Sequence, residues 1–138
     1  LWRPEKLRLQ AAELREQPGL EGVFSHVQGF ASPDLDAELR ARICVPAAPL
    51  EGIHKGTLLI RASAFHRIGP FDERVRTGDF VEWYLRAQEK GLRYRVLPQV
   101  LYLRRYHAGN HGRLVPQGRQ EYVRWLKESL DRRRTCST

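Results

Sequence analysis

The sequence predicts a single α/β domain, residues 1–138, with a short mixed sheet packed by about three main helices. Amphipathic segments with the helical period alternate along the chain with short apolar runs typical of strands, and this alternation is characteristic of α/β folds. A chain of 138 residues, 41% of them hydrophobic, is long enough to bury one core. No apolar stretch approaches the ~20 residues of a membrane-spanning helix, so we expect no membrane span.

The charge of the chain is positive and unevenly distributed. Its 24 Lys and Arg outnumber 16 Asp and Glu, and most of the net charge of +8 lies in residues 101–138. A basic end attracts phosphates, but such ends are usually solvated surfaces, and we do not expect nucleic acid as a partner. Cys44 and Cys136 lie far apart and belong to no C-x-x-C pair, so we interpret both as free thiols and expect a cytoplasmic location.

The first helix is expected from Pro4 to Leu14. Proline is favoured in the first turn of a helix, and Pro18 with Gly19 closes the segment. Leu7, Ala11 and Leu14 recur with the helical period and predict its buried stripe.

The middle of the chain predicts strands around one irregular excursion. Residues 22–30 alternate roughly between two faces, as a strand does, while residues 31–49 hold three prolines and predict a surface excursion with one helical turn within 35–42. The apolar run 57–60 predicts a buried strand that leads into a short helix over 62–68.

The strongest helical pattern covers residues 79–90 and ends at Gly91. Its apolar face consists of aromatic residues and one alanine, namely Phe80, Trp83, Tyr84 and Ala87. Residues 92–106 then predict an extended segment broken at Pro98, and residues 117–133 predict a last amphipathic helix.

Polar residues on the flank of the 79–90 helix form the first candidate site. Asp79, Glu82 and Arg86 lie on one side of the aromatic face, where carboxylates in a cleft act as general acids or bases. The same residues also fit a structural interpretation. Asp79 and Glu82 have the spacing of a capping box, and Glu82 with Arg86 has that of an ion pair one turn apart.

The second candidate site follows the extended segment. Arg104, Arg105 and His107 precede a turn with Gly109, so the arginines are placed to meet phosphate oxygens and the histidine to ligate a metal. The alternative is an ordinary polar surface turn.

Taken in order, these segments resemble the C-terminal half of a family 2 glycosyltransferase, the inverting enzymes of GT-A fold that use nucleotide-diphosphate sugars. Five stretches carry the resemblance: LWRPEKL from Leu1, GTLLIRASAF from Gly56, IGPFDE from Ile68, GDFVEWYLRAQEKGLRYRVLP from Gly78, and YLRRYHAGN from Tyr102. The resemblance covers most of the chain. It implies a partial GT-A-like domain, the acceptor-side half of the enzyme.

The resemblance also implies roles for individual residues. Asp79 or Glu82 would accept the proton of an acceptor hydroxyl, and Arg86 and Trp83 would contact the substrate. Arg104 or Arg105 would neutralise the leaving diphosphate, and His107 would assist a metal. The intact enzyme would transfer a sugar to a glycan, lipid or protein acceptor with Mg²⁺ or Mn²⁺.

The chain also departs from the family pattern. The nucleotide-binding half and its D-x-D motif should precede Trp2, so we expect the chain to be an inactive fragment that holds no cofactor alone. The literal D-x-D at 34–36 follows Pro33 in an irregular loop, and we interpret it as coincidental. Counting back from Arg86 places the family's base position on Phe80, which leaves the choice between Asp79 and Glu82 open.

Two alternatives to an enzyme fragment remain from the sequence. A half-domain would expose a sheet edge and an apolar face, which predicts a non-enzymatic module that self-associates or binds its missing half. The arginine-rich end predicts, less strongly, a nucleic-acid binder whose affinity falls steeply with salt.

Overall fold

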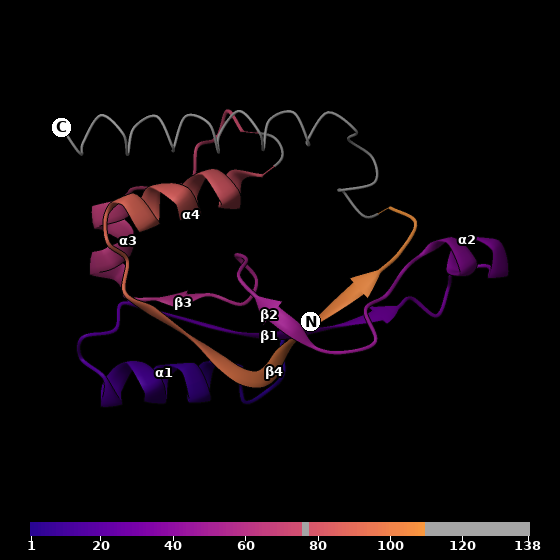
Figure 1. The fold of residues 1–138 in the computed structure, drawn as a ribbon, viewed down its shortest axis with the longest axis horizontal. Coiled ribbons are helices and arrows are strands. Elements are labelled where there is room, and N and C mark those ends of the chain that lie inside the picture. Colours follow the sequence, from indigo (N-terminus) through magenta and orange to yellow (C-terminus); the bar gives the residue numbers. More distant parts are fainter. Residues whose placement is uncertain (76–77, 110–138) are drawn as a thin grey trace. The chain divides into compact units, whose positions relative to one another are not determined.

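A computed structural model describes residues 1–75 and 78–109 (Figure 1). In these residues it has α and β elements in the order α1 (Lys6–Glu16), β1 (Gly22–Ala31), α2 (Ala37–Arg42), β2 (Leu50–Gly52), β3 (Leu59–Ile60), α3 (Ala62–Ile68), α4 (Asp79–Glu89) and β4 (Tyr94–Tyr106). The α/β class predicted from the sequence is confirmed. The helix expected over 117–133 and most of the basic end lie outside the described residues.

The chain divides into two compact units. The described part of the first comprises residues 1–61 and 93–109, and that of the second comprises residues 62–75 and 78–92. The first unit holds the sheet with α1 and α2, and the second holds α3 and α4. No helix in the described residues is long and apolar enough to cross a membrane.

β1 is the central strand of a four-stranded mixed sheet. It pairs in parallel with β4 along its whole length, from Gly22 opposite Tyr94 to Ala31 opposite Tyr106. On its other edge β1 pairs antiparallel with β3 near its start and then with β2. β1 is buried on both faces at its start, since Val23, Phe24 and Ser25 have no exposed surface.

The core of the first unit lies between α1 and one face of this sheet, as Figure 1 shows. Leu14 of α1 packs there with residues of β1 and β4, namely Val23, Leu97 and Leu101. The strand predicted for residues 22–30 and the helical turn predicted within 35–42 are both confirmed by β1 and α2.

The buried face of α1 differs from the predicted stripe. Leu7 is 48% exposed, whereas Lys6 is 1% and Gln10 is 0% exposed. Gln10 is accommodated in the interior by two hydrogen bonds, in which its amide donates to the carbonyls of Val23 and Thr57 at 2.7 Å each. The inner face is therefore Lys6, Gln10 and Leu14, and the prediction of Leu7 as a core residue was wrong.

β4 continues through Pro98 rather than ending there. The pairing with β1 shifts between Leu97 and Val100, so Pro98 lies in a bulge where it needs no ladder hydrogen bond.

The N-terminal residues Leu1–Arg3 pair antiparallel with β4, on the edge of β4 that faces away from β1. The Leu103 N–H donates to the Leu1 carbonyl at 2.8 Å, and the Arg3 N–H donates to the Leu101 carbonyl at 3.0 Å.

In the second unit, α3 and α4 pack on each other. α3 covers the helix predicted for 62–68, and α4 covers that predicted for 79–90, ending one residue earlier. Gly91 ends α4 as predicted, with a φ of +68°. The Gly91 and Leu92 N–H groups donate to the carbonyls of Gln88 and Ala87, which is the hydrogen-bond pattern of a Schellman motif.

Candidate functional site

An aromatic cluster fixes α4 within the second unit. Trp83 has no exposed surface, and its ring lies 5.4 Å from that of Phe71 and 6.0 Å from those of Phe65 and Phe80. Its indole N–H donates to the Gly69 carbonyl at 2.8 Å. The predicted aromatic face is confirmed. Trp83 acts as a packing residue in this structure, whereas the resemblance implied a substrate contact.

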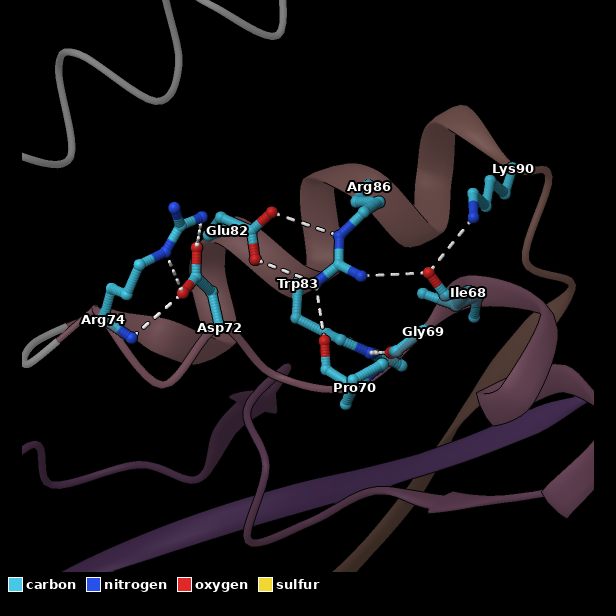
Figure 2. Close-up of polar contacts among 9 residues, drawn as sticks. All are labelled: Ile68, Gly69, Pro70, Asp72, Arg74, Glu82, Trp83, Arg86 and Lys90. Atoms are coloured by element: carbon cyan, nitrogen blue, oxygen red, sulfur yellow. Dashed lines mark hydrogen bonds and ion pairs between the residues drawn. The ribbon is translucent and has the colours of Figure 1, made fainter.

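Arg86 joins α4 to the turn that follows α3, as Figure 2 shows. Its guanidinium donates to the Ile68 carbonyl at 3.0 Å and to the Pro70 carbonyl at 2.8 Å. The turn begins at Gly69, whose φ of +96° suits glycine, and a Cβ there would lie 2.9 Å from Nη1 of Arg86. Lys90 adds a hydrogen bond to the Ile68 carbonyl at 3.2 Å. Arg86 therefore fixes the IGPFDE turn on α4.

The same guanidinium holds Glu82 in a two-point ion pair. Nε of Arg86 lies 3.1 Å from Oε1 and Nη2 lies 3.0 Å from Oε2 of Glu82, and both side chains are about three-quarters buried. Bidentate pairs of this kind are stronger than single contacts. The ion pair predicted from the i,i+4 spacing is confirmed, and both carboxylate oxygens of Glu82 accept hydrogen bonds from Arg86.

Asp79 has a different environment from Glu82. The N-cap of α4 is Gly78 in the left-handed region, with no side-chain cap, so Asp79 is the first helical residue and the predicted capping box is wrong. Asp79 is half-buried in the first turn, where the helix dipole favours a negative charge. The two candidate carboxylates are therefore distinguished by the Arg86 contact.

A second carboxylate–arginine pair, not predicted from the sequence, lies in the turn before α4. Asp72 accepts hydrogen bonds from the Arg74 side chain at 2.9 and 2.7 Å and from the Arg74 N–H at 2.9 Å (Figure 2). These bonds lower the pKa of Asp72 to about 2. The IGPFDE motif marks this position, but its spacing alone does not show which residue pairs with Asp72.

The candidate residues at the end of β4 belong to the first unit. Arg105 donates to Ser32 Oγ at 2.6 Å and to Asp34 Oδ1 at 3.0 Å. Arg104 is exposed, with its guanidinium 5.2 Å from the centre of the Tyr106 ring. His107 is exposed just after the strand. Arg105 is thus engaged by the protein, while Arg104 has no carboxylate partner in the described residues.

The two aspartates of the literal D-x-D have separate local contacts. Asp34 bonds with Ser32 and Arg105, and these two hydrogen bonds lower its pKa. Asp36 is the N-cap of α2 and accepts from the Leu39 N–H at 2.7 Å. Each aspartate therefore has a structural contact within its own loop.

The described residues do not form a site that fits Mg²⁺ or Mn²⁺. No three His, Cys, Asp or Glu side chains gather closely enough to hold a metal within residues 1–75 and 78–109. These cations prefer several oxygen ligands, whereas His107 offers a single nitrogen.

The structure brings together only part of the predicted site. Glu82 and Arg86 are in contact, with Trp83 and Asp79 on the same helix, while Arg104, Arg105 and His107 share the end of β4 in the other unit. In comparisons with known proteins, no family model matches the chain, and no curated protein matches it significantly.

Proposed function

We propose that this chain is the acceptor-side part of an inverting glycosyltransferase similar to family 2. The element order α1–β1, β3–α3, α4–β4 supports the proposal, because it follows the order of the segments that resemble that family. The nucleotide-diphosphate sugar would be held mainly by a nucleotide-binding half, and the acceptor would be a glycan, lipid or protein hydroxyl.

The observation that carries the proposal is the two-point ion pair between Glu82 and Arg86 on α4. Glu82 is neutralised by its two-point contact with Arg86, whereas Asp79 lies at the helix start, one turn away from that contact. A general base must accept a proton, and a carboxylate already paired with a guanidinium is a poor one. We therefore assign a positioning role to Glu82, and we propose as the base Asp79, the other carboxylate for which the resemblance implies this role.

The reaction follows from that assignment. Asp79 accepts the proton of the acceptor hydroxyl while its oxygen bonds to the anomeric carbon of the donor sugar. The bond from that carbon to the diphosphate breaks, the configuration inverts, and the diphosphate leaves with the bonding electrons.

Sugar transfer by the natural polypeptide that contains this sequence tests the proposal. Asp79→Asn should lower kcat by ~10²- to 10⁴-fold, the usual effect of removing a general base. Glu82→Gln is the matched control on the same helix, and it should lower the melting temperature while kcat changes less than ~10-fold. Equal small effects of both substitutions on kcat would contradict the assignment.

Residues 1–138 alone are expected to bind no nucleotide-diphosphate sugar in a Mn²⁺-dependent manner, because the described residues supply no set of metal ligands. Calorimetry with and without Mn²⁺ measures this.

Self-association and nucleic-acid binding remain the alternative functions. Light scattering tests self-association, and a binding titration at two salt concentrations tests nucleic-acid binding.

A further inference from the structure

One buried donor in the first unit has no acceptor. His54 lies in the loop between β2 and β3, and its Nδ1 accepts a hydrogen bond from the Gly56 N–H at 3.0 Å. A neutral imidazole whose Nδ1 accepts must carry its proton on Nε2. That Nε2 is fully buried without a hydrogen-bond partner, and an unsatisfied buried donor destabilises the folded state.

The Lys6 ammonium, in the same part of the unit, is a second donor whose hydrogen bonds are not all made. The Lys6 ammonium donates one hydrogen bond, to Gln10 Oε1 at 2.7 Å, and sits 4.4 Å from the centre of the Trp2 ring. An ammonium has three N–H donors, and no carboxylate pairs with Lys6 anywhere in the described residues. A buried cation without a counter-ion is rare in proteins.

His54, Lys6 and Arg104 are neighbours within the first unit. The His54 ring contacts Tyr102 of β4, with ring centres 4.9 Å apart, and Arg104 lies two residues further along the same face of that strand. Trp2 links the Lys6 amine to the β2–β3 loop, because its ring centre lies 4.4 Å from Nζ of Lys6 and its indole N–H donates to the Gly56 carbonyl at 2.8 Å. Burial first, and then the charges of Arg104 and Lys6, lower the pKa of His54. Two cations, Lys6 and Arg104, and the neutral His54 ring with its unsatisfied Nε2–H therefore lie in one part of the first unit.

We propose that Lys6 and His54, with Arg104 at the rim, bind an anionic oxygen group of the kind carried by phosphates and carboxylates. Such a group accepts the Nε2–H of His54 and a spare N–H of Lys6, and it supplies the negative charge that the described residues lack there. The Trp2 ring covers the Lys6 amine and is itself 55% exposed. A movement of this surface side chain would therefore open the amine to a ligand. All three residues belong to the first unit, and anion binding there needs no metal and no sugar transfer.

Nuclear magnetic resonance of the 138-residue chain tests the proposal with simple anions. Inorganic phosphate and acetate are titrated separately at constant ionic strength against a chloride reference, while the Nε2–H resonance of His54 and the Cε resonance of Lys6 are followed. We expect both resonances to shift together and to saturate, with Kd on the order of millimolar. Tighter binding of phosphate identifies a phosphate-bearing ligand, and tighter binding of acetate identifies a carboxylate, as from another polypeptide segment.

The control variants separate a specific site from general attraction to a basic protein. Lys6→Gln should weaken anion binding ~10-fold or more, whereas Arg8→Gln, which removes an exposed charge from the same helix, should change it less than ~2-fold. Affinity should also fall as the pH rises above about 8, where Lys6 loses its charge while Arg104 keeps its own.

Three results would overturn the proposal: no saturation with either anion, equal shifts in chloride, or equal weakening by both variants. If Lys6→Gln does not fold, the titration of the unmodified chain still decides, because its two reporter resonances belong to the proposed donors.

Discussion

Lys6 has an unusual environment for a lysine. Its side chain is 1% exposed, and burial lowers the pKa of its amine from 10.5 to about 8. Gln10 and the Trp2 ring replace only part of the solvation that water gives an ammonium. The cost of this burial has a direct consequence for stability as a function of pH.

The stability of the chain should rise between pH 8 and pH 10.5 because of Lys6. In this range the unfolded chain keeps the Lys6 proton while the folded chain releases it, so folding becomes more favourable as the pH rises. The gain is at most about 3 kcal/mol. Urea unfolding at pH 7.5 and at pH 10 measures it, with Lys6→Met as the control that should lack the rise. An equal rise in both proteins would assign the effect to other groups.

The residues of the candidate site differ in how far the sequence predicts them. The Glu82–Arg86 pair followed from its spacing alone, because neighbours one turn apart on a helix meet in any surrounding. The burial of Lys6 did not follow, since it depends on which side of α1 the sheet covers. The helical period predicts that one face of α1 is buried, but it does not fix the orientation of that face. Lys6 and Leu7 are adjacent in the sequence, so a small rotation of the helix buries Lys6 in place of Leu7.

At the scale of elements, α4 illustrates how a helix end is encoded. The Schellman motif places Gly91 at a φ of +68°, and a Cβ built there meets nothing within 4 Å. The conformation alone therefore makes glycine preferable at this position.

Gly91→Ala should destabilise the chain by about 1 kcal/mol, the cost of a left-handed conformation for a residue with a Cβ. Gly91→Asn should cost less, because asparagine tolerates this region better than alanine. Urea unfolding midpoints of the two variants and the unmodified chain measure both effects. A stability of Gly91→Ala equal to that of the unmodified chain would show that α4 ends differently in solution.

Elements with a clear period or strong end signals were predictable, and β2 was not. β1, α3 and α4 have clear period or strong end signals, whereas β2 is three residues long and had no alternation to detect. Pro98 predicted a break in the extended segment, but β4 continues, because Pro98 lies where the pairing with β1 shifts and where its missing N–H costs no ladder hydrogen bond.

At the scale of the whole molecule, the described residues are organised around the pairing of β1. Backbone groups of residues 22–27 bond to β4 on one side and to β3 or β2 on the other, and their side chains are largely buried. Hydrogen exchange should therefore be slowest in this segment, by on the order of 100-fold relative to residues 50–52 of β2. Similar rates in the two segments would contradict the central position of β1.

The parallel pairing of β1 with β4 also constrains the order in which the chain can be built. Gly22 pairs with Tyr94, so 72 residues must leave the ribosome after one partner before the other exists. The pairing of Leu1–Arg3 with residues 101–103 needs an even longer stretch of chain to be synthesised first. During synthesis, one edge of the most buried strand stays unpaired while β2, β3, α3 and α4 are made. Nascent chains with such an edge bind chaperones and aggregate readily, so production of this protein should benefit from slower translation or lower temperature.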